Sequence, residues 1–185
     1  MAQIIALVGL PGSGKTSQAQ VIADRHGWKL VSMGQLLRSR RPNLTSRLSA
    51  GDLVDSSAAE AMWEEIFSEI PKDQNIIMDS FPRLIGEAQW FFERLSTWGR
   101  SFGGVFKLEV SEEEAVRRLV ERGRMDDSEK SLRHRFELYE VATKPVLDYC
   151  RSIGRLVAVD GVGTVEEVNR RLEEAIFNHK KLGEQ

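Results

Sequence analysis

The chain has 185 residues, of which 41% are hydrophobic and 29% are charged, and these fractions are typical of one folded globular domain. The formal net charge of −2 argues against a general binder of nucleic acid or of anionic membranes. A single cysteine excludes an internal disulfide, and no apolar run approaches the ~20 residues of a membrane span. We therefore expect a cytoplasmic protein with no nucleic-acid or membrane partner.

The first motif follows an apolar, β-branched run at residues 4–8, which predicts a strand buried on both faces. Residues 9–16 match G-x-x-x-x-G-K-[ST], and residues 15–23 have the composition of a helix. Strand, glycine-rich loop and helix together predict a phosphate-binding loop, or P-loop. The residues expected to bind ATP in it are Gly9, Pro11, Gly12, Ser13, Gly14, Lys15, Thr16 and Ser17.

The chemistry of a P-loop explains these residue types. Glycines let successive backbone N–H groups converge on a polyphosphate, and the helix start adds partial positive charge. Lys15 would reach the β- and γ-phosphates, while the hydroxyl of Thr16 or Ser17 can face the Mg²⁺ that accompanies ATP.

The rest of the chain alternates between helical and strand patterns. Further strands are expected near residues 29–32, 76–78, 105–110 and 155–159. A helical stretch at 128–150 should be interrupted around Lys144 and Pro145, and the last helix should end near Asn178, before a frayed tail at 179–185. Five short strands alternating with helices predict an α/β fold with an open parallel sheet covered on both faces. Ligands of such sheets bind beyond the carboxyl ends of the strands.

Four more motifs and a late glycine follow the P-loop in order: Gly34-x-Leu-Leu-Arg38, Gly51-x-Leu-Val54, Asp79-x-Phe-Pro-Arg83, Arg124-x-Asp-Asp127 and Gly163. Over nearly the whole chain this series resembles the adenylate kinase family of nucleoside monophosphate kinases. The resemblance implies a three-layer αβα P-loop fold with strand order 2-3-1-4-5. It also implies one kinase domain over residues 1–185, with a trimmed flap for the nucleoside monophosphate at 32–57 and a short lid at 122–133.

The resemblance implies phosphoryl transfer from ATP to a nucleoside monophosphate, AMP by default, in a monomeric enzyme that uses Mg²⁺. The residues it assigns to catalysis are Lys15, Arg83, Arg122, Arg124 and Arg135. The residues it assigns to the acceptor are Met33, Gly34, Arg38, Val54, Arg83, Glu87, Arg124 and Arg135.

Four more roles come from the same resemblance. Arg122 would cover the donor adenine with the Gly163 backbone nearby, and Asp79 would sit in the water shell of the magnesium ion. Asp126 and Asp127 would orient arginines across the closing lid. The physical reasoning agrees, because cations must neutralise two polyphosphates and hold them in line. A phosphate nucleophile is already ionised at neutral pH, so no general base is needed.

The acceptor positions depart from the family pattern. Met33 stands where adenylate kinases commonly have Thr, Ser80 replaces a Gly, and Glu87 replaces the Gln that reads adenine. A carboxylate only accepts hydrogen bonds, so it suits the two donors on the guanine edge better than adenine. One hypothesis is therefore a preference shifted away from AMP. The alternative that Glu87 points elsewhere, or that Gln89 takes its place, stays open.

Two other functions also remain open. A small P-loop kinase acting on a sugar or a shikimate-like alcohol would need a base for a neutral hydroxyl, and it would leave the acceptor arginines without a purpose. A catalytically weak module that binds or senses adenine nucleotides would fit the trimmed flap, although it would not need the full set of arginines.

Overall fold

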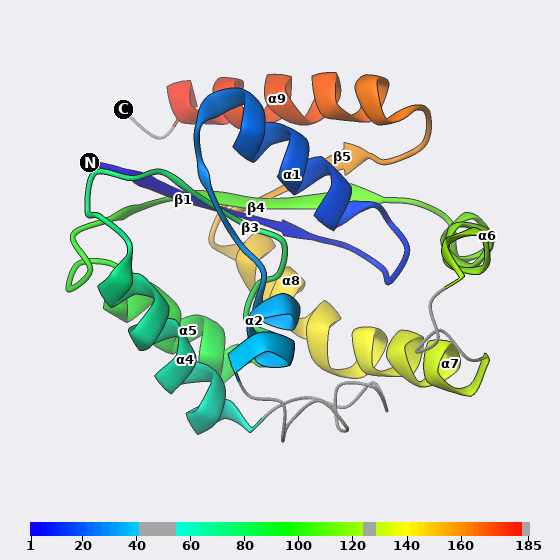
Figure 1. Cartoon of the computed structure of the whole chain (residues 1–185), viewed down its shortest axis with the longest axis horizontal. Coiled ribbons are helices and arrows are strands. Elements are labelled where there is room, and N and C mark those ends of the chain that lie inside the picture. The colour runs from blue at the N-terminus through cyan, green and yellow to red at the C-terminus, as the bar shows by residue number, and fades with distance from the viewer. Residues whose placement is uncertain (41–54, 124–128, 183–185) are drawn as a thin grey trace.

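The computed structural model describes residues 1–40, 55–123 and 129–182, which form a three-layer fold around one parallel sheet (Figure 1). The five strands are hydrogen-bonded in the order β2-β3-β1-β4-β5, and every neighbouring pair is parallel. Their bounds are β1 Gln3–Val8, β2 Lys29–Val31, β3 Ile76–Met78, β4 Ser101–Glu109 and β5 Leu156–Asp160. The predicted α/β class and strand order are confirmed.

Helices cover both faces of this sheet. Their bounds are α1 Lys15–His26, α2 Met33–Arg40, α4 Ser56–Glu69, α5 Ile85–Arg94, α6 Glu112–Arg122, α7 Glu129–Leu138, α8 Lys144–Ser152 and α9 Val165–Leu182, with a π-helical segment η2 at Tyr139–Thr143. Helices α1 and α9 lie on one face, and α2, α4, α5 and α8 lie on the other (Figure 1). Helices α6 and α7 lie together at one end of the sheet (Figure 1).

Strand β1 shows why the sheet is buried on both sides. Ile4, Ala6 and Val8 pack into the core under α4, α5 and α8, whereas Ile5 and Leu7 pack under α1 and α9. All five side chains are at most 5% exposed. Because successive strand residues point to opposite faces, a continuous apolar run is what a central parallel strand requires.

Two helix starts follow the capping pattern of the sequence. Asp55 is the N-cap of α4, and its carboxylate accepts a hydrogen bond from the Ser57 backbone N–H at 3.0 Å. The Ser111 hydroxyl accepts from the Glu114 backbone N–H at 3.2 Å and caps α6. The Glu114 side chain bonds to arginines of its own helix, and this has consequences for the P-loop described below.

The predicted interruption near Pro145 is present as a change of helix type. Helix α7 ends at Leu138, and the Lys144 backbone N–H bonds to the Tyr139 carbonyl across the wider π-helical turn before α8 begins. Proline lacks an N–H and its ring clashes with the carbonyl four residues earlier, so a regular α-helical turn is disfavoured here. The wide turn shifts the direction in which the side chains of α8 point relative to those of α7. Leu132 and Phe136 of α7 pack against α6, whereas α8 packs on the sheet.

The last helix is longer than the sequence predicts. Helix α9 runs to Leu182 rather than to Asn178, and the first glycine or proline after its start is Gly183. The fraying expected at 179–185 stays a prediction, and residues 183–185 lie outside the described residues. None of the helices that the structure describes is both long and apolar enough to cross a membrane.

Candidate functional site

A cavity of about 790 Å³ opens at the carboxyl ends of the strands. Its walls come from the P-loop, the segment after β3, the ends of α6 and α7, η2, and the turn between β5 and α9. Of the residues predicted from the sequence, it is lined by Gly9, Pro11, Gly12, Ser13, Gly14, Lys15, Thr16, Ser17, Gly34, Asp79, Arg83, Arg122, Arg135 and Gly163. Segments far apart in the chain thus meet in one cavity, at the edge of the sheet where ligands are expected.

The P-loop has a backbone that only glycine adopts readily. Gly12 and Gly14 have φ values of 86° and 94°, in the left-handed region. A Cβ atom on Gly12 would lie 2.4 Å from the Ala115 carbonyl oxygen of α6, so the loop packs directly on that helix. The two glycines turn the loop so that helix α1 begins at Lys15 with its N-terminus at the cavity. A free helix N-terminus offers backbone N–H groups to an anion.

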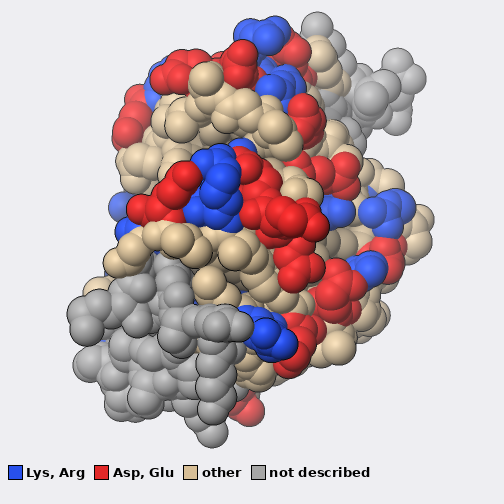
Figure 2. Space-filling model, turned by 90° about the vertical axis from the view of Figure 1, so that its right-hand side faces the viewer, with Lys and Arg blue, Asp and Glu red and all other residues tan. Residues whose placement is uncertain are grey.

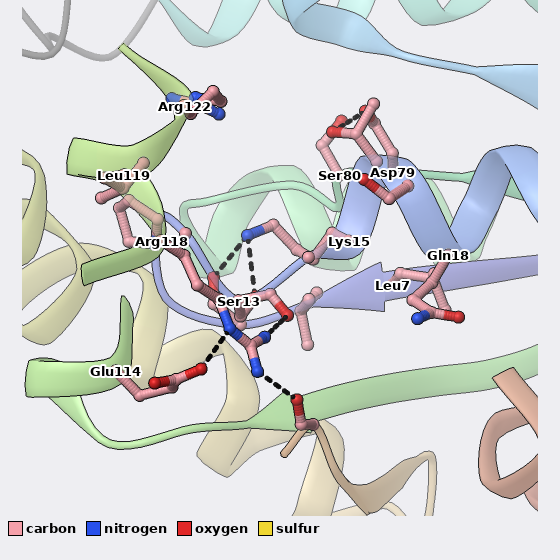
Figure 3. Close-up of a pocket in the computed structure, with 18 of the residues that line it drawn as sticks. Leu7, Ser13, Lys15, Gln18, Asp79, Ser80, Glu114, Arg118, Leu119 and Arg122 are labelled. Carbon is pink, nitrogen blue, oxygen red and sulfur yellow. Dashed lines mark hydrogen bonds and ion pairs between the residues drawn. The ribbon is translucent and has the colours of Figure 1, made fainter. Parts of the chain in front are cut away.

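Lys15 is folded onto the P-loop itself (Figure 3). Its Nζ donates hydrogen bonds to the carbonyl oxygens of Gly9 at 2.9 Å and Leu10 at 2.8 Å, and lies 3.3 Å from Ser13 Oγ. Burial and the positive charges of Arg83 and Arg122 lower the pKa of Lys15 to about 8, although Asp79 raises it. A polyphosphate in the cavity would add negative charge beside this cation.

Two oxygen-bearing side chains meet beside the P-loop. Thr16 lies at the start of α1, and Asp79 lies directly after the end of β3. The Thr16 hydroxyl donates a hydrogen bond to Asp79 Oδ2 at 2.9 Å. Strand β3 lies beside β1, so the fold places the two residues close although they are 63 positions apart. A hydroxyl and a carboxylate are ligands suited to Mg²⁺, which usually binds through one or two carboxylates and substrate phosphates.

Three of the arginines predicted from the sequence line this cavity, each from a separate element. Arg83 follows β3, Arg122 ends α6, and Arg135 lies on α7. Surrounding protein atoms and the charge of Arg135 lower the pKa of Arg83, and Glu87 and Asp79 oppose this effect. Guanidinium groups nevertheless stay charged because their ordinary pKa is so high. Like charges gathered at one cavity repel one another, and an anion bound between them would relieve that repulsion.

Arg118 is a functional residue that the sequence reasoning missed. Its guanidinium donates to Glu114 at 2.6 Å, to the Ser13 carbonyl at 3.4 Å and to the Gly161 carbonyl at 3.0 Å (Figure 3). It therefore joins α6 to the P-loop and to the turn after β5. One signal was present in the sequence, because Arg118 lies one helical turn before Arg122 and so shares a helix face with it.

The outer face of α6 is an ion-paired surface. Arg117 bonds to Glu114 at 2.7 Å and to Glu121 at 2.5 Å, and Figure 2 shows positive and negative side chains interspersed on this end of the molecule. The two arginines hold the pKa of Glu114 down at about 2, Arg117 more than Arg118. Glu114 therefore stays ionised at any physiological pH and keeps Arg118 in place over the P-loop.

Two acceptor residues predicted from the sequence do not line the cavity. Glu87 is only 8% exposed, and its carboxylate accepts from Ser56 Oγ at 2.9 Å and from the Arg83 backbone N–H at 3.1 Å. It thus ties the segment after β3 to the start of α4. Met33 packs against the core beneath α2, and Gln89 is exposed. The reading of an acceptor base by Glu87 stays a prediction, and the cavity wall gives it no support.

Several predicted residues cannot be placed. Val54, Arg124, Asp126 and Asp127 lie outside the described residues, as do most of the predicted flap and the first part of the predicted lid after Gly123. Arg38 lies within helix α2, but its side chain is also outside the part that the structure describes. Their roles stay predictions.

The low pKa of Lys15 predicts that the protein takes up protons if a polyphosphate such as ATP binds in this cavity. At about pH 8 roughly half of the free protein should carry a neutral Lys15. Phosphate charge should restore the ammonium, so about half a proton should enter per polyphosphate bound. Near pH 6 the uptake through Lys15 should vanish because the amine is already protonated. Titration calorimetry in buffers of different ionisation enthalpy measures this uptake. Lys15→Arg should bind without this component, and an equal uptake in that variant would contradict the assignment.

Comparison with known proteins agrees with this geometry. Residues 7–155 match the family model described as adenylate kinase. The chain is 37% identical to an adenylate kinase of Thermus thermophilus over 188 aligned residues, covering 95% of this chain and 98% of that protein. It is 36% identical to an adenylate kinase of Mycobacteroides abscessus, covering 93% of this chain and 98% of that protein. With the parallel sheet, the P-loop and the convergent arginines in place, the chain belongs to the adenylate kinase family.

Proposed function

We propose that this protein transfers the γ-phosphoryl group of ATP to a nucleoside monophosphate, with AMP as the default acceptor and ADP as the product. The observation that carries this proposal is the convergence of the P-loop with Arg83, Arg122 and Arg135 on one cavity. A P-loop by itself accounts for the donor. Three further arginines supply more positive charge than one nucleotide needs for binding, and they suit a second phosphate-bearing molecule that approaches the first.

The proposed mechanism is positioning and charge stabilisation. The glycine-rich backbone and the N-terminus of α1 hold the donor phosphates, and Lys15 leaves its carbonyl partners on Gly9 and Leu10 to follow the transferring group. Arg83 holds the acceptor phosphate, whose ionised oxygen attacks without a general base. Arg122 and Arg135 neutralise the charge that gathers around the transferring phosphoryl group. Arginine suits both tasks because it binds oxygens through two parallel hydrogen bonds.

The metal ion proposed with ATP fits the residues present. Thr16 and Asp79 would hold it, Asp79 through water, and Ser17 also lines the cavity with a hydroxyl. When bound, Mg²⁺ supplies positive charge to the β- and γ-phosphates. Among the described residues no group of three or more His, Cys, Asp or Glu side chains could hold a metal alone.

The arrangement favours Arg118 over Arg122 as the residue beside the donor base. Arg118 donates to the Gly161 carbonyl in the turn after β5, where Gly163 also lines the cavity. Figure 3 shows Arg118 on the lower side of Lys15, with Arg122 apart from it near the far end of α6. We therefore propose Arg118 for the donor base and Arg122 for the phosphates, as an alternative to the sequence-based prediction that Arg122 covers the base.

ADP formation from ATP with each of AMP, GMP, CMP and UMP tests the proposed function. We expect turnover that depends on the acceptor and yields ADP with AMP. Turnover with GMP in preference to AMP would favour the shifted acceptor specificity suggested by Glu87. Nucleotide binding without turnover on any of the four would contradict the proposal and favour a sensing module.

Arg83→Ala should weaken acceptor use and leave donor use nearly unchanged. Losing one charge-assisted contact to the acceptor phosphate should raise the KM for AMP by roughly 10- to 100-fold, since such hydrogen bonds contribute about 1.5–3 kcal/mol. Steady-state kinetics with each substrate varied in turn measures this effect. Arg94→Ala is the matched control, because Arg94 pairs with Glu64 away from the cavity. A rise in the KM for ATP of equal size would place Arg83 on the donor side instead.

We also propose a cytoplasmic enzyme that acts as a monomer, as the resemblance to the compact members of the adenylate kinase family implies. Size-exclusion chromatography with light scattering should give a mass near 20.9 kDa. A dimer with full activity would overturn the monomer proposal without affecting the chemistry.

A further inference from the structure

Two hydroxyl groups in the cavity wall lack a hydrogen-bond partner among the residues that the structure describes. These are Ser80 Oγ and Tyr139 Oη, and both oxygen atoms are buried. Both residues line the cavity, Ser80 directly after Asp79 (Figure 3) and Tyr139 from η2. An unpaired buried hydroxyl is unfavourable, so one that persists at a ligand cavity indicates a partner that arrives with the ligand.

The two hydroxyls belong to the same half of the cavity. Side chains alternate along β3, and Ile76 and Met78 pack into the core beneath α4, α5 and α8, whereas Ile77 packs beneath α1. Continuing this alternation, Asp79 turns to Thr16 on the α1 side and Ser80 falls on the opposite face. The Tyr139 ring packs against the core of that same opposite face.

This half is the acceptor side of the proposed reaction. The P-loop and the Asp79 carboxylate lie on the α1 side, where the donor phosphates bind. Tyr139 lies one helical turn after Arg135, whose charge acts on Arg83, so the hydroxyls and these two arginines surround the same space. The π-helical turn that begins at Tyr139 widens the helix at this wall, and such turns are frequent at functional sites.

The chemistry of the two groups differs from that of the arginines beside them. Burial, with Glu140 and Glu109 adding to it, raises the pKa of Tyr139 to about 12, so the phenol remains a hydrogen-bond donor throughout the working range. A serine hydroxyl both donates and accepts. Neutral groups of this kind suit the sugar hydroxyls and base edge of a nucleotide, whereas the arginines match its phosphate charge.

We propose that Ser80 and Tyr139 bind the nucleoside part of the acceptor, with Ser80 Oγ and Tyr139 Oη hydrogen-bonding its ribose or base when the nucleotide is bound. This inference rests on the proposed function, because that function names the acceptor. It adds two specificity-determining residues to the acceptor half.

The test is a pair of variants that remove only the hydroxyls, Ser80→Ala and Tyr139→Phe. Each should raise the KM for AMP by about three- to tenfold and leave the KM for ATP within about twofold, as expected for the loss of one neutral hydrogen bond. The melting temperature of the ligand-free protein should stay the same or rise, because an unpaired hydroxyl leaves a buried site. Tyr149→Phe is the matched control, because Tyr149 packs against the same core and does not line the cavity.

Other results would overturn the proposal. A lower melting temperature of the ligand-free variants would show that the hydroxyls have structural partners. An unchanged KM for AMP, or equal changes for both substrates, would remove them from the acceptor site. Calorimetric titration with AMP and with GMP separates this inference from the proposed function. If the wild type binds a monophosphate without turning it over, the phosphotransferase proposal fails, and weaker binding to both variants still supports the hydroxyl contacts.

Discussion

Replacing Lys15 with methionine should lower the rate of phosphoryl transfer by about 10²–10³-fold while the protein stays folded. Lys15 is the one charged side chain of the P-loop, so it alone can stay paired with the phosphoryl group as that group moves to the acceptor. Methionine has a similar length but carries no charge. The effect should appear in single-turnover ADP formation with both substrates saturating, since the loss is then in the chemical step rather than in binding.

The same substitution should change stability little. The ammonium loses hydrogen bonds to Gly9 and Leu10, but removal of a desolvated cation near Arg83 and Arg122 offsets that loss. Thermal melting followed by circular dichroism checks this expectation. Lys29→Met on β2 is the matched control, because Lys29 is exposed and does not line the cavity. A Lys15→Met protein that retained most of its activity would contradict the role given to this residue.

Gly12→Ala should damage both the fold and ATP binding. An alanine Cβ would lie 2.4 Å from the Ala115 carbonyl and 2.8 Å from the Leu119 side chain, at a φ of 86° that alanine rarely adopts. The Ala115 carbonyl belongs to the backbone of α6 and cannot rotate out of the way as a side chain can. The loop must therefore move away from the helix. We expect a loss of about 1–3 kcal/mol in the free energy of unfolding, measured by urea denaturation.

The affinity for ATP should fall in the same variant, because the backbone N–H groups of the displaced loop no longer converge on the phosphates. Gly86→Ala is the matched control, since a Cβ there meets no atom within 4 Å and helix α5 favours alanine by up to about 1 kcal/mol. A Gly12→Ala protein with the unfolding free energy and ATP dissociation constant of the wild type would show that the loop is not held against α6.

The fold and the donor half of the site were predictable because local patterns determine them. The continuous apolar run of β1 requires burial on both faces, and the glycine spacing that follows it requires a left-handed turn at Gly12 and Gly14. The strand order came from the family resemblance and was confirmed. The interruption before Pro145 was predicted from the missing N–H, although its π-helical form depends on how α7 and α8 pack.

The missed features depend on contacts between distant segments. Arg118 acts on the P-loop only because α6 packs on Gly12, which spacing within α6 does not reveal. The sequence suggests that Glu87 reads the acceptor base, and it does not show that Ser56 at the start of α4 and the Arg83 backbone donate to its carboxylate. The missing partner of Ser80 Oγ is likewise a property of the packed structure, since the sequence shows only that a hydroxyl is present.

A crystal structure with a bisubstrate analogue, two adenosines joined by a chain of phosphates, tests the account most directly. The account predicts the phosphate chain running from the P-loop to Arg83, with Lys15, Arg122 and Arg135 in contact with its oxygens and Thr16 and Asp79 beside the metal. A phosphate chain bound elsewhere, or these guanidinium groups turned into solvent with the analogue in place, would contradict it.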